Sequence, residues 1–205
     1  MIRAVLFDMD GVLIDATDWH YDALNEALEV FGYTISRTEH LERFNGMTTK
    51  SKLQILSKEK GLPAELHDVI SSIKQDRTLR IAANKCFPTA AHLILLSNLR
   101  DRGLKIGVVT NSIRMTTEFM LTYAGITDFL DVVVTNEDVL KPKPDPEGYL
   151  LGMSKLGVSP SETVIIEDGV HGIAAGIAAG AMVIEVENPG DVSLEILGKI
   201  LRQYS

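Results

Sequence analysis

The sequence predicts an α/β fold: a Rossmann-like parallel sheet flanked by helices, with an all-helical segment inserted after the first strand. Short apolar runs alternate with helical patterns through most of the chain. Near-continuous apolar strands of this kind are typical of a sheet that is covered on both faces. Between the first and second runs, about seventy residues show only helical patterns, which is far more than a crossover connection needs.

The predicted strands are brief apolar runs, too short for helices. The first ends at the turn signal Asp10-Gly11. In chain order they are residues 2–7, 104–109, 131–134, 163–166 and 181–186.

The predicted helices of the core lie between these strands and stop at glycines. Residues 89–102 end at Gly103, residues 114–124 end at Gly125, and residues 146–156 begin with a proline and end before Gly157.

The inserted stretch has helical spacing around Trp19 and over residues 48–60 and 64–83. We therefore expect an α/β core of residues 1–14 and 85–205 and a helical cap of residues 15–84.

Composition excludes several classes of protein. The 205 residues carry a net charge of −8, which opposes nucleic-acid and anionic-membrane partners. The single cysteine, Cys86, cannot form an intrachain disulfide or a four-thiolate zinc site. No apolar run approaches the ~18–20 residues that span a bilayer, and the N-terminus lacks a signal-peptide layout. We expect a soluble, cytoplasmic protein, and its oligomeric state stays open.

Polar residues follow four of the predicted strands, directly or after a short loop. The carboxyl ends of parallel strands meet at one edge of a sheet, where open α/β folds bind ligands. Each short sequence alone is more often a turn, a helix N-cap or a solvated lysine. Together they supply metal ligands, a nucleophile and a phosphate-binding cation. In chain order they are Asp8 and Asp10, then Thr110, Asn111 and Ser112, then Lys141, and finally Glu167 and Asp168.

Four motifs in this order resemble the haloacid dehalogenase-like hydrolases, in particular the phosphatase and β-phosphoglucomutase subgroup with a helical cap after the first strand. The resemblance covers essentially the whole chain and is weakest in the cap. The matching motifs are Asp8-Met9-Asp10-Gly11-Val12, Thr110-Asn111-Ser112, Lys141-Pro142-Lys143-Pro144-Asp145, and Glu167-Asp168 with the small residues that follow up to Gly180.

The resemblance implies a two-step phosphoryl transfer. Asp8 would be the nucleophile that forms an aspartyl-phosphate, and Asp10 would protonate the leaving oxygen and later deprotonate the attacking water. A Mg²⁺ ion would be held by Asp8, the Asp10 carbonyl and Asp168, with Glu167 assisting directly or through water.

The resemblance also assigns the groups that hold the phosphoryl oxygens and balance their charge. Thr110 and the backbone amide of Asn111 would hold these oxygens. Lys141 would balance negative charge and position Asp8, and it is preferred to Lys143 because it occupies the family's position before Pro-x-Pro-Asp.

In the cap, His20, Gly46 and Lys50 are candidate substrate contacts. His20 has the alternative of being a helix histidine whose hydrogen bonds are satisfied within the fold. Mutases of the β-phosphoglucomutase type carry an arginine near Thr49, which this chain lacks. Lys50, Lys52 and Arg43 lie nearby, although lysines on a helix are ordinarily solvated.

The favoured function is a Mg²⁺-dependent phosphatase that acts on a small phosphorylated metabolite, such as a sugar phosphate. Asp10 favours phosphoryl transfer over dehalogenation, because a halide leaves without a proton. The alternative is a sugar phosphomutase of the β-phosphoglucomutase type. A non-catalytic binding protein on the same scaffold is a third hypothesis, opposed by the presence of both Asp8 and Asp10. The substrate and pathway stay open.

Overall fold

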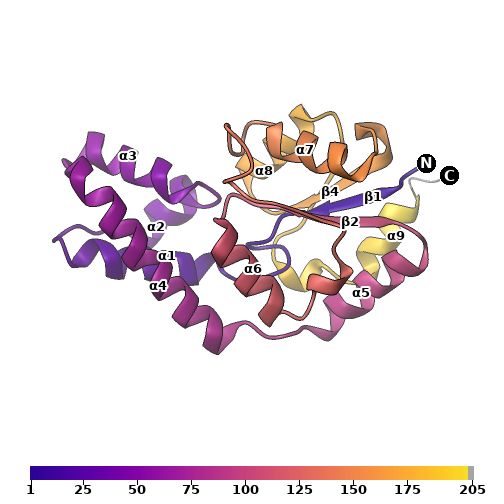
Figure 1. Cartoon of the computed structure of the whole chain (residues 1–205), viewed down its shortest axis with the longest axis horizontal. Helices are drawn as coiled ribbons and strands as arrows, with labels where there is room; N and C mark the ends of the chain where they lie inside the picture. The colour runs from indigo at the N-terminus through magenta and orange to yellow at the C-terminus, as the bar shows by residue number, and fades with distance from the viewer. Residues whose placement is uncertain (203–205) are drawn as a thin grey trace.

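The computed structural model describes residues 1–202 and contains a five-stranded parallel sheet in the order β3-β2-β1-β4-β5 (Figure 1). Strand β1 is central, and Ala4 pairs with Lys105 of β2 on one side and with Thr163 of β4 on the other. The strands are β1 (Ala4–Phe7), β2 (Lys105–Val109), β3 (Val132–Val134), β4 (Thr163–Glu167) and β5 (Met182–Glu185). The predicted parallel sheet is confirmed, with strands slightly shorter than most of the apolar runs.

Helices cover both faces of the sheet. Figure 1 shows α7 (Glu147–Leu156) and α8 (Val170–Ala178) above it, and α5 (Ala90–Asp101), α6 (Arg114–Tyr123) and α9 (Leu194–Arg202) below it. In β1, Leu6 packs toward α7 and α8. Its neighbours Val5 and Phe7 pack into the cluster on the opposite face. Both faces are therefore buried, which is why the strands are continuous apolar runs.

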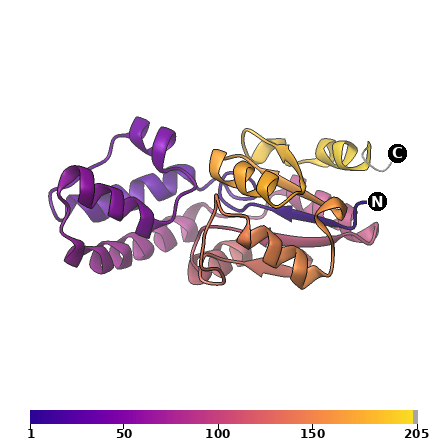
Figure 2. The same cartoon turned by 90° about the horizontal axis from the view of Figure 1, so that it is seen from above.

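Residues 16–85 form helices and turns, with no strand in this stretch. These helices extend beyond one end of the sheet (Figure 2) and enclose their own apolar cluster, which includes Leu28, Phe44 and Leu53. The elements are α1 (Thr17–Glu29), α2 (Arg37–Glu39), a π-helical turn (His40–Phe44), α3 (Thr49–Lys60), a 3₁₀ turn (Ala64–Leu66) and α4 (His67–Lys85). Helices α1 and α4 pack together along their length.

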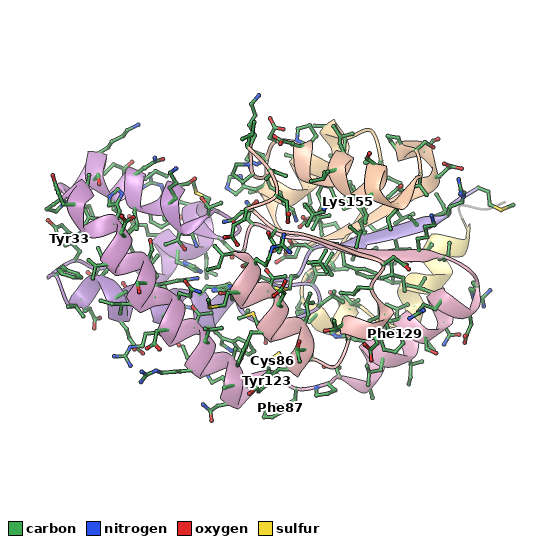
Figure 3. The ribbon with its side chains drawn as sticks, viewed as in Figure 1. Tyr33, Cys86, Phe87, Tyr123, Phe129 and Lys155 are labelled. Atoms are coloured by element: carbon green, nitrogen blue, oxygen red, sulfur yellow. The ribbon has the colours of Figure 1, made fainter. Side chains whose placement is uncertain are left out.

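The chain returns from α4 to the sheet through residues 86–89. Cys86 is buried there, and its thiol donates to the carbonyl of Met120 at 3.4 Å. Phe87 and Tyr123 lie nearby at the surface (Figure 3).

Two features depart from the sequence expectation. Helix α9 was not predicted, although Ile196 and Ile200 pack into the core beneath the sheet. The pattern over residues 64–83 is divided into a short 3₁₀ turn and α4, which extends to Lys85. Within the described residues, no helix combines the length and apolar character needed to cross a membrane.

The strand order changes direction between β1 and β4. After β1 the chain adds β2 and β3 on one side, and then crosses to add β4 and β5 on the other. Ligand sites in open α/β sheets lie at such a change of direction, outside the carboxyl ends of the strands. Asp8 and Asp10 follow β1, and Glu167 and Asp168 stand at the end of β4.

Candidate active site

A buried lysine joins the ends of β1 and β4. Lys143 Nζ lies 2.6 Å from Asp8 Oδ1 and 2.6 Å from Glu167 Oε1. The hydroxyl of Tyr149 also donates to Glu167 Oε1, and the Lys143 ammonium lies 4.7 Å from the centre of the Tyr149 ring. Burial alone would lower the pKa of Lys143, but the two carboxylates outweigh it and raise that pKa. The lysine therefore stays charged.

The prediction that Lys141 occupies this position is wrong. The Lys141 side chain is 74% exposed, and its ammonium lies 3.9 Å from Asp145. Glu147 accepts the backbone N–H of Lys141 at 3.0 Å, whereas the side chain of Asn111 binds the backbone of Lys143. These two contacts hold the loop so that Lys143, and not Lys141, enters the site.

Three carboxylates meet beside Lys143. Oxygens of Asp8, Glu167 and Asp168 all lie within 4.8 Å of one another. Burial, aided by the charge of Glu167, raises the pKa of Asp168 to about 6. A cluster of hard oxygen donors suits Mg²⁺.

Two glycines make room for these carboxylates. A Cβ on Gly172 would lie 1.8 Å from Glu167 Oε1. At Gly11, φ is +89° and a Cβ would lie 2.0 Å from Asp168 Oδ2. Any side chain at either position would displace a carboxylate.

Asp10 lies between the sheet and the helical segment. Ser112 Oγ donates to Asp10 Oδ2 at 2.7 Å, and His20 Nε2 of α1 lies 3.1 Å from Asp10 Oδ1. Lys74 Nζ of α4 in turn lies 3.1 Å from His20 Nδ1. Burial would raise the pKa of Asp10, but His20 and Ser112 outweigh it and lower that pKa, so the carboxylate form is favoured.

Asn111 binds two segments through its side-chain amide. Its Nδ2 donates to the carbonyls of Gly46 at 2.8 Å and Lys143 at 3.1 Å, and its Oδ1 accepts from the backbone N–H of Lys143 at 3.0 Å. The sequence drew attention only to the backbone amide of Asn111. Thr110, directly before it, is buried, and its hydroxyl accepts from the backbone N–H of Ser112 at 3.0 Å.

These groups surround one cavity of about 290 Å³ between the sheet and the helical segment. The wall from the sheet includes Asp8, Asp10, Thr110, Asn111, Lys143, Glu167 and Asp168. The wall from the helices includes His20, Gly46, Lys50, Lys52 and Lys74. Every candidate residue from the sequence except Lys141 therefore lines this cavity.

Several lining or supporting residues had no sequence signal of their own. Lys74 and Tyr149 stand within helical patterns that indicate only secondary structure. Lys52 was noted as an ordinary solvated lysine, but it is 6% exposed. Their roles depend on which helix face meets the cavity.

The chain matches known proteins over most of its length. Residues 5–186 match the family model of the haloacid dehalogenase-like hydrolases. The chain is 33% identical over 181 residues to pyrophosphatase PpaX of Bacillus pumilus, covering 87% of this chain and 80% of that protein. It is 31% identical over 197 residues to hexitol phosphatase A of Escherichia coli K12, covering 92% and 85%.

A solved structure supports the fold. The β-phosphoglucomutase of Clostridium difficile superposes with a TM-score of 0.86 at 22% identity, over 100% of this chain and 99% of that chain.

Proposed function

The chain belongs to the haloacid dehalogenase-like hydrolases, and from this premise we propose that it is a Mg²⁺-dependent phosphatase of small phosphorylated metabolites. The observation that carries the proposal is the meeting of Asp8, Lys143 and Glu167 at the carboxyl ends of β1 and β4. The names of its relatives, a pyrophosphatase and a hexitol phosphatase, support phosphate as the group that is released.

We assign the nucleophile to Asp8. In the first half of the reaction, an oxygen of Asp8 bonds to phosphorus while the bond from phosphorus to the substrate oxygen breaks. Asp10 gives a proton to that leaving oxygen. Lys143 offsets the negative charge of Asp8, so that a phosphate dianion can approach it.

The second half releases phosphate. A water oxygen attacks phosphorus, Asp10 takes the water proton, and the bond from phosphorus to Asp8 breaks. The lowered pKa of Asp10 keeps its carboxylate ionised, so that it can accept this proton. The proton that Asp10 takes from the water is the one that it gives to the leaving oxygen in the next cycle. Thr110 and the backbone amide of Asn111 are assigned to the phosphoryl oxygens.

The donor set fits Mg²⁺, because the clustered side chains of Asp8, Glu167 and Asp168 all offer carboxylate oxygens. Asp8, Asp168 and the backbone carbonyl of Asp10 would hold the ion. Glu167 would act through water, because its oxygens already accept from Lys143, Tyr149 and the backbone N–H of Asp168. When bound, the ion supplies positive charge to the phosphoryl oxygens.

We assign residues 15–84 to a cap that selects the substrate and residues 1–14 and 85–205 to the catalytic core. The cavity supports this division, since its chemistry-bearing groups follow β-strands, whereas its second wall comes from α1, α3 and α4. A closed cap would exclude water that competes with the substrate.

The alternative is a sugar phosphomutase. The cations on the helical wall of the cavity support it, because a mutase must hold a bisphosphate, whereas Thr49 in place of an arginine opposes it. Release of inorganic phosphate from a sugar monophosphate would indicate the phosphatase. Formation of an isomer, stimulated by a catalytic bisphosphate, would indicate the mutase.

A phosphate-release screen across sugar, nucleotide and glycolytic monophosphates tests the proposal. We expect Mg²⁺-dependent release with the wild type and none with Asp8→Asn, with unchanged circular dichroism. Steady-state hydrolysis by Asp8→Asn at the wild-type rate would falsify the assignment of the nucleophile. Absence of release from every compound would contradict the phosphatase function.

A further inference from the structure

Tyr149 of α7 is a buried polar residue beside the carboxylates of the site. It is 0% exposed, and its hydroxyl donates to Glu167 Oε1. A hydroxyl buried without a partner is unfavourable, and a hydrogen bond to a charged acceptor is stronger than one between neutral groups. The proposed reaction steps give this hydroxyl no part, so any effect that it has on the site passes through Glu167.

Two glycines bring Tyr149 to the end of β4. A Cβ on Gly148 would lie 3.1 Å from Val109 Cγ1, and a Cβ on Gly152 would lie 3.3 Å from Val109 Cγ2. Helix α7 therefore packs closely on β2 through its glycine face. This close packing places the hydroxyl of Tyr149 against Glu167.

Glu167 is held in place by three donors. Lys143 Nζ, at 2.6 Å, and the Tyr149 hydroxyl both donate to Oε1, and the backbone N–H of Asp168 donates to Oε2 at 3.2 Å. A carboxylate oxygen has two lone pairs, so the two donors to Oε1 use both of its acceptor positions. Among the three donors, the Tyr149 hydroxyl is the one that can be removed without changing the charge or the backbone.

The position of Glu167 bears on which ion the carboxylate cluster prefers. An oxygen of Glu167 lies within 4.8 Å of oxygens of Asp8 and Asp168, so a turn of its side chain would add a ligand. Mg²⁺ requires near-octahedral geometry and keeps several waters, whereas Ca²⁺ takes about six to eight oxygen ligands in flexible geometry. A further carboxylate in direct contact would therefore strengthen the binding of Ca²⁺ more than that of Mg²⁺.

We propose that Tyr149 is a positioning residue that holds Glu167 away from direct contact with the metal ion and thereby favours Mg²⁺ over Ca²⁺. The inference rests on the proposed Mg²⁺-dependent function and adds the residue that sets the choice of ion. Without the hydroxyl, Glu167 Oε1 regains a free acceptor position and loses one of the contacts that fix its side chain.

Metal binding tests this inference without turnover. Isothermal titration calorimetry measures the dissociation constants of Mg²⁺ and Ca²⁺ for the wild type, for Tyr149→Phe and for Tyr33→Phe. In the wild type we expect Mg²⁺ to bind at least as tightly as Ca²⁺. In Tyr149→Phe we expect the preference to shift toward Ca²⁺ by roughly 10-fold, the effect of one further carboxylate ligand.

Tyr33→Phe is the matched control, because it removes a hydroxyl that donates to the carbonyl of Gly61 at 3.1 Å in the helical segment (Figure 3). It is expected to keep the wild-type ratio of the two dissociation constants. In a Glu167→Gln background, Tyr149→Phe is expected to change that ratio by less than about twofold, because the carboxylate through which it acts is gone. The inference is overturned if the wild type binds Ca²⁺ more tightly than Mg²⁺, if Tyr149→Phe leaves the ratio unchanged, or if the shift is equal in the Glu167→Gln background.

Phosphate release distinguishes failure of the proposed function. Release by the wild type in Mg²⁺, with an unchanged ion preference in Tyr149→Phe, overturns the inference and leaves the phosphatase in place. The expected shift in Tyr149→Phe, without release from any compound, supports the inference and contradicts the phosphatase. A wild type that binds neither ion overturns the inference and the assignment of Mg²⁺ together.

Discussion

Asn111 and Lys143 are joined by two hydrogen bonds between the side-chain amide of Asn111 and the backbone N–H and carbonyl of Lys143, at 3.0 and 3.1 Å. The same amide donates to the carbonyl of Gly46 in the helical segment. One side chain therefore fixes the loop that carries Lys143 and also contacts the opposite wall of the cavity.

The Asn111→Asp substitution tests this link. Aspartate keeps the shape and the acceptor but loses both donors, and it brings negative charge against two carbonyls. We expect kcat to fall roughly 10- to 100-fold, because Lys143 is no longer held against Asp8. Steady-state kinetics measures the loss. Asn84→Asp, on the exposed face of α4, is expected to behave as the wild type. Equal kinetics for the two variants would contradict the link.

The two lysines of the loop are expected to differ sharply. Lys143→Met leaves the carboxylates of Asp8 and Glu167 buried without a cation, so we expect activity to disappear and stability to fall by about 3–5 kcal/mol. Lys141→Met removes an exposed ammonium and is expected to shift stability by less than about 0.5 kcal/mol. Urea unfolding and phosphate release measure both effects. Larger losses of activity and stability in Lys141→Met than in Lys143→Met would instead assign the catalytic role to Lys141.

The glycine beside Glu167 is expected to tolerate no side chain. In Gly172→Ala the added Cβ would lie 1.8 Å from Glu167 Oε1, so the carboxylate must move away from Lys143. We expect a loss of about 2 kcal/mol or more and little remaining activity. Gly169→Ala is the control, because a Cβ there meets nothing within 4 Å. Equal melting temperatures for Gly172→Ala and Gly169→Ala would contradict the packing argument.

Stability should depend on pH through Lys52. Its pKa is about 7 in the folded protein and near 10.5 when solvated, so unfolding takes up a proton between these values. Burial of the charged ammonium therefore lowers the free energy of unfolding by its full amount below pH 7. This destabilisation decreases as the pH rises and disappears near pH 10.5. Lys52→Met is therefore expected to stabilise the protein by about 2–4 kcal/mol at pH 6, and by progressively less at higher pH. Urea unfolding at pH 6, 8 and 9.5 measures this trend, and a gain that does not shrink with pH would contradict it.

Metal removal should abolish turnover without unfolding the chain. EDTA is expected to stop phosphate release, and added Mg²⁺ is expected to restore it, because the oxygens of Asp8, Glu167 and Asp168 converge. The far-ultraviolet circular dichroism should remain unchanged, since Lys143 offsets much of the charge of the cluster. Turnover that persists in EDTA would remove the metal from the reaction.

The sheet and much of the site were predictable because both follow from local order along the chain. Apolar runs become buried parallel strands, and the residue after a strand must emerge at its carboxyl end. This logic brought Asp8, Thr110 and Asp168 to one cavity.

The sequence misled where a long-range contact decides the geometry. Lys141 and Lys143 stand two residues apart in one motif, and the choice between them is made by Asn111 and Glu147 from other segments. The burial of Lys52 likewise depends on how α3 packs, which its weakly amphipathic sequence does not indicate.

The two walls of the cavity come from separate stretches of the chain, strand ends on one side and helices α1, α3 and α4 on the other. Under the proposed division of the chain, most of the reacting groups and the groups that select the substrate lie on different walls of the cavity. Transplanting the stretch from Thr49 to Lys74 from a relative offers a route to new specificity on an inherited catalytic apparatus.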